Sequence, residues 1–119
     1  MSTESEVVAA GPNDELILLR GCNGSQLARL QQHNADPASP APTEAEARAQ
    51  VGEQPFGDVI EFTTDPTVAQ RFGTGGHVAA IQIKKKYLTK GSVSESGWLC
   101  KATAPWTFLD SRAGRAFLV

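Results

Sequence analysis

The sequence predicts an α+β fold in which a mostly antiparallel or split β-sheet carries short helices on one side. The order of its segments supports this class, because a strand, helices, a strand and a helix precede a run of strands. A length of 119 residues with 40% apolar residues is enough for one modest core. We therefore expect a disordered leader over residues 1–14 and a single domain over 15–119, in which 34–57 form a flexible internal loop and a short helix.

The first half of the chain alternates turn signals with short periodic runs. The apolar run from Leu16 to Leu19 ends abruptly at Arg20-Gly21, which is typical of a buried strand. Ser25 is a plausible N-cap for a helix over 26–33. Thr43 and Glu46 have the spacing of a capping box, which predicts a helix over 44–51.

The second half contains most of the predicted strands. A strand over 58–64 leads into Asp65-Pro66, an N-cap acid followed by proline at the first helical position. That helix should end at Phe72, before Gly73. Further strands are predicted over 77–87 and 98–100, and two more over 105–109 and 116–119, joined by residues 110–114.

Charge and composition exclude several classes of function. The net charge of −2 and the predominance of acidic residues argue against a surface for non-specific nucleic-acid binding. No stretch is long and apolar enough to span a membrane, and the N-terminus lacks the basic start and apolar run of a secretory signal. Cys22 and Cys100 are expected to be free thiols, although a disulfide is possible. They cannot form a metal site alone, and none is predicted.

Three separated segments resemble the ADP-ribosyltransferase superfamily, in its Arg…Ser-Thr-Ser…Glu branch. That branch includes cholera-type toxins, Rho-modifying exoenzymes and many polymorphic bacterial toxin domains. The segments are Leu16-Ile17-Leu18-Leu19-Arg20-Gly21, Ile60-Glu61-Phe62-Thr63-Thr64-Asp65-Pro66 with the Ala69-x-x-Phe72 that follows, and Tyr87 to Trp98 around Glu95. The chain departs from the family at Phe62, where the first serine is missing, and at Val93, where the family often has Glu or Gln.

The resemblance implies a compact ADP-ribosyltransferase-like split β-sandwich with short helices. It also implies a mono-ADP-ribosyltransferase that uses NAD as a substrate, needs no metal and releases nicotinamide. By the same analogy the chain would be a bacterial toxin or effector domain acting in the cytoplasm, with a target-cell protein as a candidate acceptor and an immunity protein as a candidate partner.

The resemblance also assigns roles to the candidate site residues. Glu95 would stabilise the oxocarbenium-like transition state, and Arg20 would bind the diphosphate through its fork of donors. One hydroxyl of the Thr63-Thr64 pair would hold the glutamate in place, and the other would contact NAD. Gly21 would allow close approach of the dinucleotide. Phe72 would form a wall near the nicotinamide by the same resemblance, although core packing is the favoured role of a phenylalanine at the end of a helix.

Three alternatives stay open from the sequence. The same residues would serve an NAD glycohydrolase, with water as acceptor. A catalytically inactive binding module would retain the fold without the reaction. An unrelated α+β domain with coincidental motifs would have Arg20, Thr63 and Glu95 on different faces.

Overall fold

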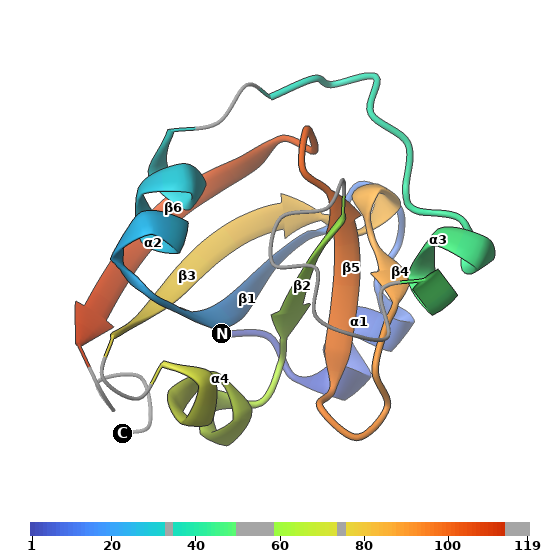
Figure 1. Cartoon of the computed structure of the whole chain (residues 1–119). Coiled ribbons are helices and arrows are strands. Elements are labelled where there is room, and N and C mark those ends of the chain that lie inside the picture. The colour runs from blue at the N-terminus through green and yellow to red at the C-terminus, as the bar shows by residue number, and fades with distance from the viewer. Residues whose placement is uncertain (33–34, 50–58, 74–75, 114–119) are drawn as a thin grey trace.

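The structure is a computed structural model that describes residues 1–32, 35–49, 59–73 and 76–113. Within these ranges the strands form one six-stranded sheet in the order β4-β5-β2-β1-β3-β6, in which every neighbouring pair is antiparallel (Figure 1). The predicted α+β class is therefore confirmed. The strands are β1 (Glu15–Cys22), β2 (Val59–Thr63), β3 (His77–Lys84), β4 (Thr89–Lys90), β5 (Gly97–Lys101) and β6 (Trp106–Ala113).

At the centre of the sheet, the pairing between the neighbouring strands β1 and β2 is reduced to one residue pair. β1 pairs with β3 over eight residues, and β2 pairs with β5 over five. Between β1 and β2 the register has one pair, Leu19 with Thr63. The sheet thus consists of two halves of three strands each, β6-β3-β1 and β2-β5-β4. Little main-chain pairing joins the two halves.

The helices are short and begin at capping residues. α2 (Gly24–Gln31) starts at Asn23, whose side chain accepts from Gln26 N, so the predicted cap at Ser25 is wrong by two residues. α3 (Glu44–Ala49) has the capping box predicted for Thr43 and Glu46. α4 (Pro66–Phe72) begins after Asp65 and ends at Gly73, as predicted.

The leader expected to be disordered contains a helix, α1 (Glu4–Ala9). Thr3 and Glu6 form a capping box at its start, and Val7 is fully buried in the main core. Ser2 extends the contact, because its N–H donates to Ile17 O at 3.0 Å and its hydroxyl accepts from Ile17 N at 2.9 Å. These contacts with the sheet, which the local sequence does not reveal, order the segment.

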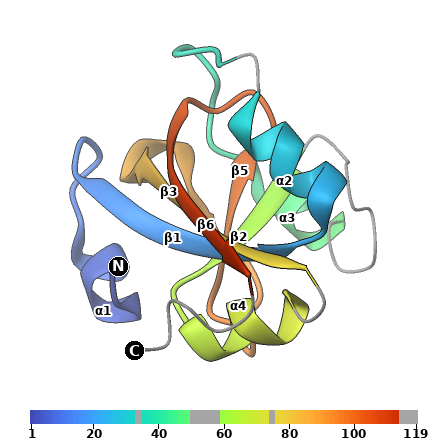
Figure 2. The same cartoon turned by 90° about the vertical axis from the view of Figure 1, so that its left-hand side faces the viewer.

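Helices cover both faces of the sheet, so the expectation of helices on one side is wrong. Leu18 lies in the larger core cluster with Val7 of α1 and Leu30 of α2. Its neighbour Leu19 lies in a second cluster with Ala69 of α4. Because side chains alternate along a strand, these clusters lie on opposite faces. Figure 2 shows α4 separated from α2, with the strands between them.

The C-terminal part differs from the prediction. β6 runs without a break to Ala113, through residues 110–113 that were expected to connect two strands. It pairs along β3, and a shift in register between Ala80 and Ile81 accommodates the irregular part of the strand. The predicted strand over 116–119, the end of the predicted helix over 44–51 and much of the segment 34–57 lie outside the described residues.

None of the helices in the described part of the chain combines the length and apolar character that crossing a membrane requires.

Candidate active site

Arg20 lies near the end of β1 on the face of the larger core. Its Nη1 donates to the main-chain oxygen of Glu61 on β2 at 2.7 Å. Burial lowers the pKa of the guanidinium, and the nearby Cys22, Glu61 and Cys100 offset this only in part. The group stays charged at neutral pH. Among the described residues it has no ion pair, and Glu61 O is its one hydrogen-bond acceptor.

Thr63, at the end of β2, holds the loop that carries Glu95. Its hydroxyl donates to Glu95 O at 2.7 Å and accepts from Asp65 N at 3.0 Å. The next residue, Thr64, donates its main-chain N–H to Ser96 O at 3.2 Å. Two consecutive residues, Thr63 and Thr64, therefore hold the carbonyl oxygens of two consecutive loop residues, Glu95 and Ser96.

Glu61 holds the same loop from its base. Its carboxylate accepts from Ser92 N at 3.0 Å. A Cβ added at Gly91 or Gly97 would lie 2.5 or 2.3 Å from Glu61 Oε2, so only glycine fits beside this carboxylate at both positions. The Glu61 side chain is half-buried and positions the loop.

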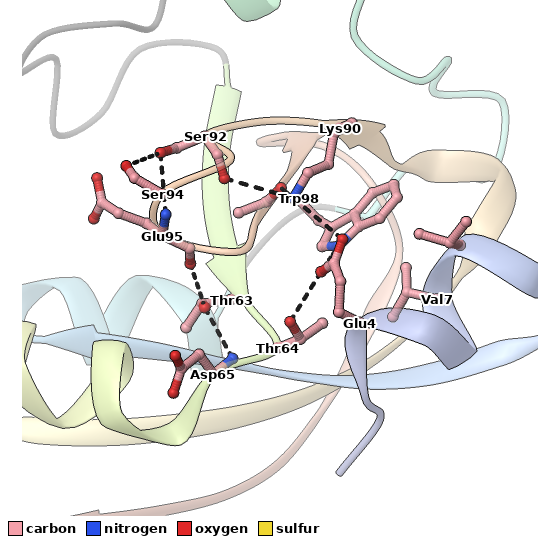
Figure 3. A network of polar contacts seen from close by, with 12 residues as sticks. Glu4, Val7, Thr63, Thr64, Asp65, Lys90, Ser92, Ser94, Glu95 and Trp98 are labelled. Carbon is pink, nitrogen blue, oxygen red and sulfur yellow. Dashed lines mark hydrogen bonds and ion pairs between the residues drawn. The ribbon is translucent and has the colours of Figure 1, made fainter.

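The Glu95 side chain is half-exposed at the tip of this loop. Its N–H donates to Ser92 Oγ at 3.3 Å, while its carboxylate has no hydrogen bond or ion pair with any other described residue. Figure 3 shows the carboxylate pointing away from the Trp98 indole. The loop is thus held through its main chain, and the acid is left available.

Thr64 belongs to a second network, which includes α1 (Figure 3). Its hydroxyl and the indole N–H of Trp98 both donate to Glu4 Oε1 at 3.0 Å. Lys90 Nζ lies 3.3 Å from Glu4 Oε2. Burial by itself raises the pKa of Glu4, but the hydrogen bonds from Trp98 and Thr64 and the charge of Lys90 together bring it below its ordinary value.

The two threonines therefore face different ways. Thr63 pairs with Leu19 and Gly97, and residues directly opposite each other share a face, here the face covered by α4. Arg20 has the alternate orientation, and Thr64 faces α1 on the side of the larger core. β2 brings Arg20, Thr63 and the Glu95 loop to one strand, but it does not bring Arg20 and Thr63 to one face.

Gly21 and Phe72, both predicted to contact NAD, lie beside each other for another reason. A Cβ on Gly21 would lie 2.3 Å from Ala69 O and 2.4 Å from Gly73 N, so Gly21 allows α4 to pack against β1. The Phe72 side chain is 59% exposed, and the Arg71 guanidinium lies 5.7 Å from its ring centroid. The expected packing of Phe72 in the core is therefore wrong.

Sequence reasoning missed the α1 network. Trp98 and Trp106 are both buried, and Trp98 also donates to Glu4. A signal for α1 was present, because Thr3 and Glu6 have the same spacing as Thr43 and Glu46. A shallow pocket lies elsewhere, between the segments 36–40 and 101–103, and none of the predicted site residues lines it.

The two cysteines lie near Arg20 but cannot form a disulfide in the folded sheet. Cys22 is on β1 and Cys100 is on β5, with β2 between them. Two strand spacings are about 10 Å, and a disulfide requires Cα atoms within about 7 Å. Burial raises the pKa of Cys100 to about 12, although the nearby Arg20 charge acts in the opposite direction. Among the described residues there is no group of three or more potential metal ligands of the His, Cys, Asp or Glu type.

Comparison with known protein families gives one match for the chain. Residues 3–111 match the family described as Domain of unknown function (DUF4765), and the chain belongs to this family. The match includes α1, the strands that carry Arg20 and Thr63, and the loop that carries Glu95. No curated protein matches the chain.

Proposed function

We propose that the chain is an NAD-dependent mono-ADP-ribosyltransferase that transfers ADP-ribose from NAD to an acceptor and releases nicotinamide. One observation carries the proposal. Two hydrogen bonds of 2.7 Å connect distant segments to the short strand β2. One runs from Arg20 to Glu61 O, 41 residues away in sequence, and the other from Thr63 to Glu95 O, 32 residues away. The fold would then be a small ADP-ribosyltransferase-like split β-sandwich, which the narrow β1–β2 junction supports.

Arg20 supplies the cation that an NAD diphosphate needs. A desolvated charge without a counter-ion is costly, and an anionic ligand relieves that cost. The guanidinium has five N–H donors, of which Glu61 O takes one within the described residues. Arg20 and Thr64 would both contact NAD from the side of the larger core.

Glu95 acts on the ribose. A carboxylate close to the oxocarbenium-like centre stabilises positive charge that develops only in the transition state, so it raises the rate more than the binding affinity. Thr63 is a positioning residue, because its hydroxyl is committed to the main chain of Glu95. The sequence left open which threonine has which role, and the orientations favour Thr63 for holding the loop.

A binding module without catalysis is the second candidate. It is favoured by Phe62, which is almost fully buried in the core. Phe62 stands at the position where the ADP-ribosyltransferases of this branch have the first serine of their motif. Such a module would bind NAD and release no nicotinamide. The opposite orientations of Arg20 and Thr63 favour instead the third alternative, an unrelated α+β domain with coincidental motifs.

The decisive measurement is nicotinamide release from NAD by wild-type protein and by Glu95→Gln. We expect a loss of about 10²–10³-fold with unchanged NAD affinity, the range typical of removing one group that stabilises charge in the transition state. Glu6→Gln is the control, because it makes the same chemical change at an exposed position of α1. Equal turnover by wild type and Glu95→Gln would exclude Glu95 as the group that stabilises the transition state.

Labelled NAD added to a target-cell lysate, followed by mass spectrometry, identifies the acceptor class. A labelled protein supports transfer, and by analogy a toxin or effector role in a target-cell cytoplasm with an immunity protein as partner. Free ADP-ribose with no labelled macromolecule indicates an NAD glycohydrolase instead.

A further inference from the structure

We propose that α1 is an autoinhibitory element whose Glu4 carboxylate occupies an anion-binding site, which accepts a phosphate group of a diphosphate ligand when α1 is released. The inference rests on the proposed function in one respect, because NAD is the ligand whose diphosphate would compete with Glu4. The site itself is defined by contacts that do not depend on catalysis.

Three donors from separate parts of the chain converge on one carboxylate. The Thr64 hydroxyl and the Trp98 indole N–H bind Glu4 Oε1, each at 3.0 Å, and the Lys90 ammonium lies 3.3 Å from Oε2. A hydroxyl, an indole N–H and an ammonium group are also donors that bind phosphate oxygens, and charge-assisted hydrogen bonds of this kind are the strong ones. The chain's own acid therefore stands where an anionic ligand could bind (Figure 3).

The positive charge around this site exceeds the charge of Glu4. The ammonium of Lys90 lies 5.0 Å from the centroid of the Trp98 ring, and that of Lys85 lies 5.2 Å from it. Lys85 also donates to the carbonyl of Val7 near the end of α1. Two lysines thus lie next to a ring whose one acidic contact among the described residues is the Glu4 carboxylate, and a phosphate group would match their charge better.

α1 is an element that a ligand could displace. A helix of six residues is not stable by itself in water, so its order depends on its contacts with the sheet. Those contacts are the Glu4 network, the Lys85 bond, the burial of Val7 and the pairing of Ser2 with Ile17. Release of α1 would free Thr64 on the side of the sheet where Arg20 lies.

The first experiment measures binding of inorganic pyrophosphate by calorimetry at low salt. Glu4→Gln should bind pyrophosphate about tenfold more tightly than the wild type, because the neutral amide competes less well for the donors. Glu6→Gln is the matched control: it makes the same change in the same helix, keeps the capping box and should bind as the wild type does. In the Glu4→Gln background, Thr64→Val should remove the gain.

Equal affinity of wild type and Glu4→Gln, or no binding by either, would overturn the proposal. A tenfold gain in Glu4→Gln without any nicotinamide release by either the wild type or Glu4→Gln would support the anion site and refute the proposed enzyme. Nicotinamide release that is equally fast in wild type and Glu4→Gln at low NAD, without a gain in pyrophosphate affinity, would support the enzyme and refute autoinhibition.

A second measurement uses the wild-type protein and does not depend on the folding of a variant. The indole N–H resonance of Trp98 should shift on titration with pyrophosphate, because its acceptor changes from a carboxylate to a phosphate. Trp106 is the internal reference, since its indole N–H donates to Leu30 O on another part of the core. Equal shifts of both resonances, or of neither, would contradict the site.

Discussion

The two edges of β2 are closed in different ways. Toward β5, five consecutive residue pairs run from Val59–Lys101 to Thr63–Gly97. Toward β1 there is one pair, and the Arg20 side chain adds a hydrogen bond across this edge to Glu61 O. An edge closed by main-chain pairing is fixed by the fold, whereas an edge closed by side chains can exchange its partners for a ligand. The candidate site spans both edges, because Arg20 lies on β1 and the Glu95 loop leads into β5.

The largest effect on stability should come from the edge that is closed by main-chain pairing. Leu99 is buried on β5 opposite Glu61, and Leu99→Ala should lower the free energy of unfolding by about 2–5 kcal/mol through lost burial and a residual cavity. Urea denaturation measures this value. A loss below about 1 kcal/mol would mean that this edge relaxes as easily as the other.

Arg20→Met tests the edge that is closed by side chains. It should cost at most about 1–2 kcal/mol of stability, because removal of a desolvated charge offsets part of the lost hydrogen bond to Glu61 O. NAD affinity, measured by calorimetry, should nevertheless fall by about tenfold or more. A loss of stability as large as that of Leu99→Ala, with NAD affinity unchanged, would make Arg20 a structural residue.

Thr63→Val removes the hydroxyl that holds Glu95 while keeping the shape of the side chain. We expect a cost of about 1 kcal/mol and faster amide hydrogen exchange over residues 92–97. Thr63→Ser is the control that keeps the donor, and it should exchange as slowly as the wild type. Similar exchange in all three proteins would show that Glu61 and the main-chain bond from Thr64 to Ser96 hold the loop without the Thr63 hydroxyl.

The smallest effect is the pH dependence contributed by Glu4. Its pKa is lowered in the folded state, so its contribution to stability is present at neutral pH and is lost as the pH falls below about 5. The urea midpoint of the wild type should therefore fall more between pH 7 and pH 4 than that of Glu4→Gln. Identical falls in the two proteins would show that the charge of Glu4 does not hold α1.

The sequence was most informative where structure is decided locally. Asp65 with Pro66 defined the start of α4, and Thr43 with Glu46 defined the start of α3, because a cap depends on residues within one helical turn. The apolar run before Arg20 identified β1 for the same reason: burial imposes a pattern on consecutive residues.

The sequence was least informative where distant residues decide the structure. The order of α1 depends on Trp98, which is 94 residues from Glu4, so the polar composition of residues 1–14 suggested disorder. The continuity of β6 depends on pairing with β3, although residues 110–113 resemble a turn. The opposite orientations of Arg20 and Thr63 depend on the register between β1 and β2, which no local pattern fixes.

Because β2 lies between Cys22 and Cys100, the two thiols can serve as a disulfide-trapping probe of strand separation. A crosslink between them can form only in molecules in which the strands have separated, because the native distance is too long for the bond. Under mild oxidation, the crosslinked protein would accumulate as a faster-migrating band on a non-reducing gel. The rate of its accumulation would then measure how often the strands of the native sheet separate.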